Sequence, residues 1–157
     1  MIVVGVDGSE CSHAALRFAL KEAQIRDAKL RLVVVWHVPL AAYGAGWAPP
    51  PPHLSEDSQA AAQDVLSEAM EIVGAEIGEI EVEPVIREGQ PARVLVDEST
   101  DVEMLIVGSR GHGGFRELML GSVSQQCAHH ARCPVVIVRP GCENAPGEEH
   151  TAKALEN

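Results

Sequence analysis

The sequence predicts an α/β protein built on a doubly wound parallel sheet. Short, almost wholly aliphatic segments recur along the chain, and amphipathic helical segments alternate with them. Aliphatic segments without polar alternation are typical of strands that helices cover on both faces. Two of these segments run directly into loops rich in glycine and small polar residues. Repeated strand–helix alternation implies parallel strands joined by right-handed crossovers.

Composition and charge narrow the class of protein. The chain has 157 residues, 46% of them hydrophobic and 22% charged, which suits one globular domain. Its net charge of −11 disfavours nonspecific binding to nucleic acids or anionic membranes. No apolar run approaches the ~18 residues of a membrane span, and the first residues do not resemble a signal peptide. Four cysteines without metal-ligand spacing are typical of reduced thiols, so we expect a cytoplasmic protein.

The first half of the chain predicts two strands and two helices. A strand over Ile2–Val6 stops at Asp7-Gly8-Ser9, and Ser9 is expected to cap a helix that runs to Asp27. A second strand is predicted over Leu30–Val38. The proline-rich stretch that follows includes Pro49–Pro52, which we expect to lie in a long connection or lid rather than in a helix. Ser55 is then expected to cap a helix that ends near Ile77.

The second half predicts three further strands. Pro84 lies within a strand over Glu81–Arg87, which favours an edge position. Gly89-Gln90-Pro91 is expected to open a helix that ends near Ser99. Strands are then predicted over Met104–Val107 and Pro134–Arg139, with a helix from about Ser122 to Ala131 between them. We expect one domain over residues 1–140 and a polar, acidic tail over residues 141–157.

A candidate anion site follows the strand over Met104–Val107. Glycines at 108, 111, 113 and 114 form a loop, and Gly121-Ser122 opens the next helix. Backbone N–H groups of such a loop, together with a helix N-terminus, make an anion-binding concavity. If the strand over Ile2–Val6 is a neighbour, Asp7 faces this loop at the switch point of strand order, where ligands bind in such sheets.

The spacing Gly108-x2-Gly111-x9-Gly121-Ser122 resembles the glycine pattern of the ATP-binding subgroup of the universal stress protein family. MIVVGVDGSE at the start, WHV, EGQPA and CPVVIVRP extend the resemblance over about residues 1–140. It implies a Rossmann-like (adenine nucleotide alpha hydrolase-like) three-layer sandwich. The implied sheet has five parallel strands in the order 3-2-1-4-5. The resemblance also implies a homodimer, which we expect to form through the last strand, Val135–Val138.

The same resemblance implies an adenine-nucleotide site. The glycines, Ser122 and Val123 would hold ribose and phosphates, the backbone of Val38 would bond the adenine edge, and Asp7 would bond the adenosine or help orient a metal. The candidate binding residues are Val6, Asp7, Ser9, Val38, Gly108, Arg110, Gly111, His112, Gly121, Ser122, Val123 and Ser124.

Plainer roles compete at several of these positions. Asp7 also fits a carboxylate at a helix entry, and Arg110 and Arg116 fit solvated side chains. His112 is expected to lie over the ligand or in solvent rather than to act in catalysis. Ser122 could cap the helix, and either Ser122 or Ser124 could accept a phosphoryl group.

We expect ATP as the ligand, with Mg²⁺ or Mn²⁺ held mainly through its phosphates. The chain has no Walker lysine motif, no GxGxxG after the first strand and no evident general base. The sequence therefore favours a nucleotide-dependent regulatory protein with slow or no hydrolysis. The alternatives are a slow ATPase or autophosphorylating protein, and a structural dimer module that binds no nucleotide.

Overall fold

The computed structural model describes residues 1–37, 52–76, 80–112 and 120–141. Strands and helices alternate along these residues as the sequence predicts. The elements are β1 (Ile2–Val6), α1 (Glu10–Arg26), β2 (Leu30–Trp36), α2 (Pro52–Glu76), β3 (Val82–Glu88), α3 (Pro91–Glu98), β4 (Met104–Gly108), α4 (Ser122–His130) and β5 (Val135–Val138).

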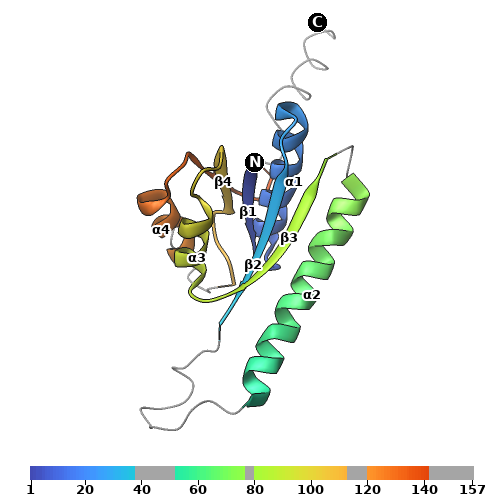
Figure 1. Cartoon of the computed structure of the whole chain (residues 1–157), viewed down its shortest axis with the longest axis vertical. Coiled ribbons are helices and arrows are strands. Elements are labelled where there is room, and N and C mark those ends of the chain that lie inside the picture. Colours follow the sequence, from blue (N-terminus) through green and yellow to red (C-terminus); the bar gives the residue numbers. More distant parts are fainter. Residues whose placement is uncertain (38–51, 77–79, 113–119, 142–157) are drawn as a thin grey trace, which may run out of the picture.

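The strands form one parallel sheet in the order β3-β2-β1-β4-β5, which confirms the predicted topology. β1 is central and pairs with β2 on one side and with β4 on the other. α1 and α2 cover one face of the sheet, and α3 and α4 cover the other, so the fold is a three-layer sandwich (Figure 1).

Alternate residues of each strand supply two separate cores. Ile2, Val4 and Val6 point to the face covered by α1 and α2, and are almost fully buried there. Val3 points to the opposite face, where it packs in a cluster with Leu95 of α3. Because both of their faces are buried, the central strands β1 and β4 carry no polar side chain, and this is why the sequence pattern identified them.

Two boundaries differ from the sequence prediction in the first half of the chain. α2 begins at Pro52, so Ser55 lies inside the helix and does not cap it. A proline is tolerated in the first helical turn, where its missing N–H has no intrahelical partner to lose. β2 ends at Trp36 rather than at Val38. Val38 itself lies outside the described residues, as does most of the proline-rich stretch.

Helix starts are otherwise close to expectation, with one correction at α4. Ser9 is the N-cap of α1, and its side chain accepts a hydrogen bond from the Ser12 N–H, as predicted. Pro91 occupies the first turn of α3. At α4, however, the N-cap is Gly121, and Ser122 is already the first helical residue. The predicted cap role of Ser122 is therefore wrong, and this helix has no side-chain cap.

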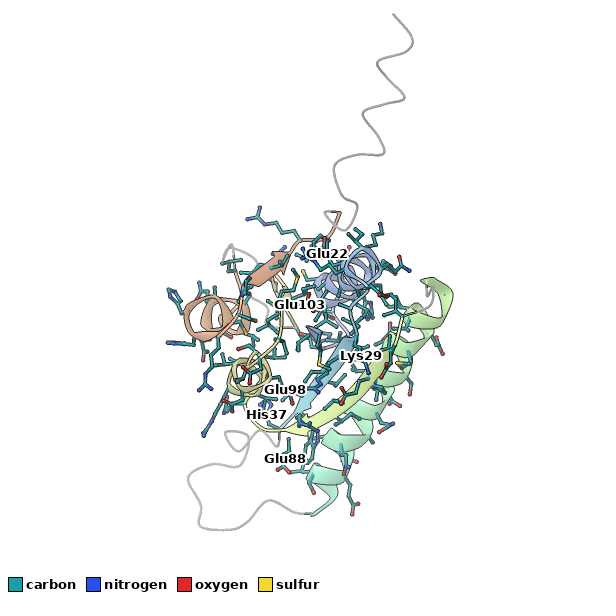
Figure 2. All side chains as sticks on the ribbon, turned by 45° about the horizontal axis from the view of Figure 1, so that its top comes forward. Glu22, Lys29, His37, Glu88, Glu98 and Glu103 are labelled. Atoms are coloured by element: carbon teal, nitrogen blue, oxygen red, sulfur yellow. The ribbon has the colours of Figure 1, made fainter. Side chains whose placement is uncertain are left out.

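The two edges of the sheet differ in charge. β3 lies at one edge, as Pro84 predicted, and also carries Glu83 and Arg87. These two residues join an ion-pair network with Arg31 of β2 and Glu98 of α3, at distances of 2.9 to 3.1 Å. Figure 2 labels Glu98 in this region. β5, at the other edge, is Val-Val-Ile-Val and has no charged residue.

Among the described helices, none is both long and apolar enough to cross a membrane.

Candidate functional site

A cavity of about 470 Å³ lies at the carboxyl ends of β1, β2 and β4. Its walls also come from the beginnings of α3 and α4. Because β2 and β4 flank β1 on opposite sides, this is the switch point of strand order, where ligands of open α/β sheets bind. In Figure 2, His37 and Glu88 mark this end of β2 and β3. The volume is in the usual range for small-molecule sites.

The cavity brings together most of the residues predicted from sequence. Of the twelve candidates, Ser9 does not line the cavity but contacts residues that do, and Val38 lies outside the described residues. Gly113, Gly114 and Arg116 also lie outside them. The ten that line it are Val6, Asp7, Gly108, Arg110, Gly111, His112, Gly121, Ser122, Val123 and Ser124.

Local hydrogen bonds fix the side chain of Asp7 at the end of β1. Its Oδ1 accepts two of them, from the backbone N–H of Ser9 at 3.0 Å and from the Ser9 hydroxyl at 2.5 Å. The Asp7 N–H donates to Ser12 Oγ at 3.3 Å. Gly8 turns the chain between them with φ of +81°, a conformation that favours glycine. The sequence showed Ser9 as a cap, but it did not show that Ser9 also orients Asp7.

The other carboxylate oxygen of Asp7 is directed at the glycine loop. A Cβ on Gly111 would collide with Asp7 Oδ2, so the missing side chain of Gly111 leaves room for the Asp7 carboxylate in its present position. Among the described residues, none donates a hydrogen bond to Oδ2. This oxygen is therefore a free acceptor at the cavity wall, suited to a ligand hydroxyl and unsuited to a phosphate.

His112, in the glycine loop, connects this loop to the loop after β1 by a second contact. Its Nε2 lies 2.8 Å from the backbone carbonyl oxygen of Asp7, so the ring donates a hydrogen bond across the switch point. The sequence placed His112 over the ligand or in solvent, and it did not indicate this bond. The Arg110 side chain is exposed beside it, at the cavity wall.

Ser109 connects the start of the glycine loop to the start of α4. Its carbonyl oxygen accepts from the Gly121 N–H at 2.8 Å and from Ser124 Oγ at 3.0 Å. Ser124 Oγ also lies 2.9 Å from the Gly121 carbonyl oxygen, and the residue is only 2% exposed. Its hydroxyl is thus committed within the protein, whereas Ser122 is exposed. If either serine accepts a phosphoryl group, the geometry favours Ser122.

The N-terminus of α4 forms an anion-binding wall. The first N–H groups of a helix, here from Ser122 to Ser124, have no intrahelical acceptor and carry partial positive charge. Gly121 leaves this end open because it has no side chain to cap it. A Cβ on Gly121 would meet only ordinary contacts, the nearest being Arg110 Cα at 3.4 Å, and its φ of −75° suits any residue. The protein's own packing therefore does not require a glycine here.

The opposite side of the cavity is apolar, and sequence analysis did not find it. Strand-end residues and two α3 residues line it: Gly5, Val33, Val35, Val107, Pro91 and Leu95. These positions look like ordinary core residues in the sequence. Only the strand order shows that they meet beside Asp7, so a local sequence signal was absent.

Within the described residues, no group of three or more His, Cys, Asp or Glu side chains could hold a metal ion. Cys127 is fully buried, and this burial raises the pKa of its thiol to about 11, so it stays protonated near neutral pH. A metal at this site would have to be held mainly by atoms of the bound small molecule. Asp7 Oδ2 is the carboxylate oxygen of the cavity wall that accepts no hydrogen bond from the described residues.

Comparison with known proteins identifies the family. The model of the universal stress protein family matches residues 1–139. A universal stress protein of Mycolicibacterium smegmatis is 36% identical over 143 residues, covering 87% of this chain and 47% of that protein. One from Mycobacterium tuberculosis is 33% identical over 140 residues, covering 88% and 44%. The chain thus spans about half the length of the curated relatives it matches.

Solved structures agree in fold. UspA from Lactobacillus plantarum superposes with a TM-score of 0.74 at 24% identity, covering 88% of this chain and 96% of that one. A universal stress protein in complex with cAMP has a TM-score of 0.62 at 26% identity, covering 88% and 96%. One from Archaeoglobus fulgidus in complex with dAMP has a TM-score of 0.60 at 26% identity, covering 87% and 95%. From the match to the family model and the sequence relatives, this chain belongs to the universal stress protein family.

Proposed function

We propose that this chain binds an adenine nucleotide, ATP above all, in the cavity between β1 and β4. The nucleotide would act as a regulatory ligand in a stress-response switch, with slow or no hydrolysis. The observation that carries the proposal is the open N-terminus of α4, where Gly121 is a glycine that the protein's packing does not need. Free cysteine thiols at 11, 127 and 133 support a cytoplasmic setting.

The polarity of the cavity supports the following arrangement of the nucleotide in this proposal. Phosphates belong at the N–H groups of Ser122 and Val123, where the helix dipole favours negative charge. The ribose hydroxyls belong at Asp7 Oδ2, and the base belongs against the apolar side. Family relatives solved with cAMP and dAMP support an adenine nucleotide as the class of ligand.

The slow or absent hydrolysis in this proposal is supported by the lack of a suitable acid or base among the described residues near the expected phosphate position. The segment 104–124 contains no lysine, and its one described histidine, His112, is bonded to the Asp7 carbonyl. Mg²⁺ or Mn²⁺ would be held mainly through phosphate oxygens and water, and when bound it would neutralise phosphate charge. Ser9, Asp7 and the α4 N–H groups orient the ligand.

The proposal is tested by identifying nucleotide that co-purifies with the protein. Mass spectrometry of the natively purified chain should detect ATP, ADP or AMP, and a phosphate-release assay should show little or no turnover. Turnover well above background would count against the regulatory role. Turnover that disappears in Ser122→Ala would support the enzymatic alternative instead. If no adenine nucleotide is recovered and none binds in a titration, the chain is a structural module and the proposal is wrong.

Asp7 gives a second test, aimed at the ribose. Asp7→Asn keeps the side-chain shape but replaces one carboxylate oxygen with a donor, so AMP should bind about 10- to 100-fold more weakly, as expected when a hydrogen bond to a charged group is lost. The same substitution should have little effect on 2′,3′-dideoxy-AMP, which has no ribose hydroxyls to lose. Calorimetric titration of both ligands completes a thermodynamic cycle. Tighter AMP binding by Asp7→Asn would place the phosphates, not the ribose, beside Asp7.

We also propose that two copies pair through β5, the uncharged edge of the sheet. Unpaired backbone N–H and C=O groups on an apolar edge strand can form hydrogen bonds with a strand of another chain. Sedimentation at micromolar concentration should give twice the 16.7 kDa of one chain. Ile137→Lys on β5 should shift the protein to a monomer, whereas Ile86→Lys, on edge strand β3, should leave it dimeric. A wild-type mass of 16.7 kDa would contradict this proposal.

A further inference from the structure

The apolar side of the cavity is continuous with the core under α3 and α4. Val33, Val107 and Leu95 line the cavity and also belong to the buried cluster on that face of the sheet. A flat apolar group that enters the cavity therefore contacts core side chains directly. Such side chains are close-packed and move little, so they define the shape of what they admit.

Leu95 is a cavity-lining side chain that rests directly against the sheet. It is only 4% exposed, and it lies directly over Gly5 of the central strand. Its Cδ1 and Cδ2 atoms lie 2.8 and 3.1 Å from where a Cβ on Gly5 would be. The missing side chain of Gly5 thus allows Leu95 to rest on the β1 backbone, and the leucine cannot move further toward the sheet.

The helix that carries Leu95 is held at both ends. Pro91 fixes the backbone of its first turn. Near its last turn, Glu98 forms ion pairs with Arg31 at 2.9 Å and with Arg87 at 3.1 Å. Glu98 itself is only 13% exposed, and its pair with Arg31 is partly buried, whereas the Arg87 side chain is half exposed. Because β1 blocks movement of Leu95 toward the sheet and α3 is anchored at both ends, Leu95 forms a firm wall of the cavity.

We propose that Leu95 is a specificity-determining residue that limits the size of the base this cavity admits. This inference rests on the proposed function and adds the residue that limits the size of the bound base. Adenine fits between the strand ends and Leu95, and an adenine enlarged on the edge that meets α3 does not. The neighbouring wall residues Val33, Val35 and Val107 are aliphatic, so in this part of the cavity the described side chains select by shape and not by hydrogen bonds.

The test pairs an enlarged ligand with an enlarged cavity. Wild type is titrated with AMP and with AMP derivatives that carry a benzyl or phenyl group at N6, C2 or C8. At least one derivative should bind tenfold or more weakly than AMP. Leu95→Ala should raise the affinity for that derivative by at least tenfold relative to the affinity for AMP. Leu95→Phe should weaken AMP itself by at least tenfold, because the ring occupies the space of the base.

Val94→Ala is the matched control on the same helix. Val94 is half-buried, packs toward Gly89 and does not line the cavity, so its substitution should leave the order of ligand affinities unchanged. If Leu95→Ala does not fold, Leu95→Val should change the relative affinities in the same direction by a smaller factor. If wild type binds AMP but neither Leu95 variant changes the order of affinities, this inference is wrong. If wild type binds no adenine nucleotide, the proposed function fails first.

Discussion

Gly121→Val should weaken binding of adenine nucleotides by about 100-fold while changing the fold very little. The backbone at Gly121 has φ of −75° and ψ of 163°, which a valine adopts readily. Its Cβ would meet nothing closer than 3.4 Å, so the cost to the protein is that of a poorer N-cap, about 1 kcal/mol. The γ methyl groups, however, would stand at the open end of α4 where the phosphates need to approach.

The expected loss of affinity corresponds to about 3 kcal/mol, the worth of one or two charge-assisted hydrogen bonds. Calorimetric titration measures this loss of affinity. The melting temperature of the nucleotide-free protein should fall by only about 2–4 °C. Gly74→Ala is the matched control, since a Cβ there meets nothing within 4 Å. It should leave binding unchanged and slightly stabilise α2. Unchanged affinity in Gly121→Val would show that phosphates bind elsewhere.

Gly108→Ala, in contrast to Gly121→Val, should mainly reduce the free energy of unfolding. This loss should be measurable in the absence of nucleotide. A Cβ on Gly108 would lie 2.7 Å from the carbonyl carbon and 2.8 Å from the carbonyl oxygen of Cys11. These are backbone atoms of α1, so relief requires the helix to move away from the centre of the sheet. Overpacking of this kind typically costs 1–3 kcal/mol, and contact with a backbone favours the upper end.

For a domain of this size, about 3 kcal/mol lowers the unfolding temperature by about 6–12 °C. Circular dichroism of the nucleotide-free variant measures this, because bound nucleotide would stabilise the protein and mask the change. A melting temperature within about 2 °C of wild type would mean that α1 does not depend on this contact. The two substitutions together separate a glycine that helix packing requires from one that packing does not explain.

The contrast between Gly108 and Gly121 shows how far the sequence could go. Both belong to one spacing pattern, and the pattern predicted that they lie near a common site. It could not say why each is a glycine, because the reason depends on which atoms of α1 or of the loop come close in space. Gly111 is a third case, since its missing side chain leaves room for Asp7.

The fold was predictable because β1, β4 and β5 are aliphatic or glycine along their length, β2 is nearly so, and helical segments alternate with the strands. Element boundaries failed where a single residue has two compatible roles. Pro52 could end a loop or begin a helix, and the structure has α2 beginning there rather than after Ser55. The start of α4 at Ser122, by contrast, is the predicted one. Leu95 and Ser109 escaped prediction because their roles arise only when α3 and α4 are placed against β1 and β4.

The difference between the two sheet edges also bears on how far self-association can proceed. A pair of copies joined at β5 would present only β3 strands at its outer edges. Each outer edge carries Glu83, Pro84 and Arg87, and charges and prolines on an edge strand oppose further strand addition. Sheet growth should therefore terminate at two copies, which keeps a chain rich in aliphatic strands from polymerising into fibres.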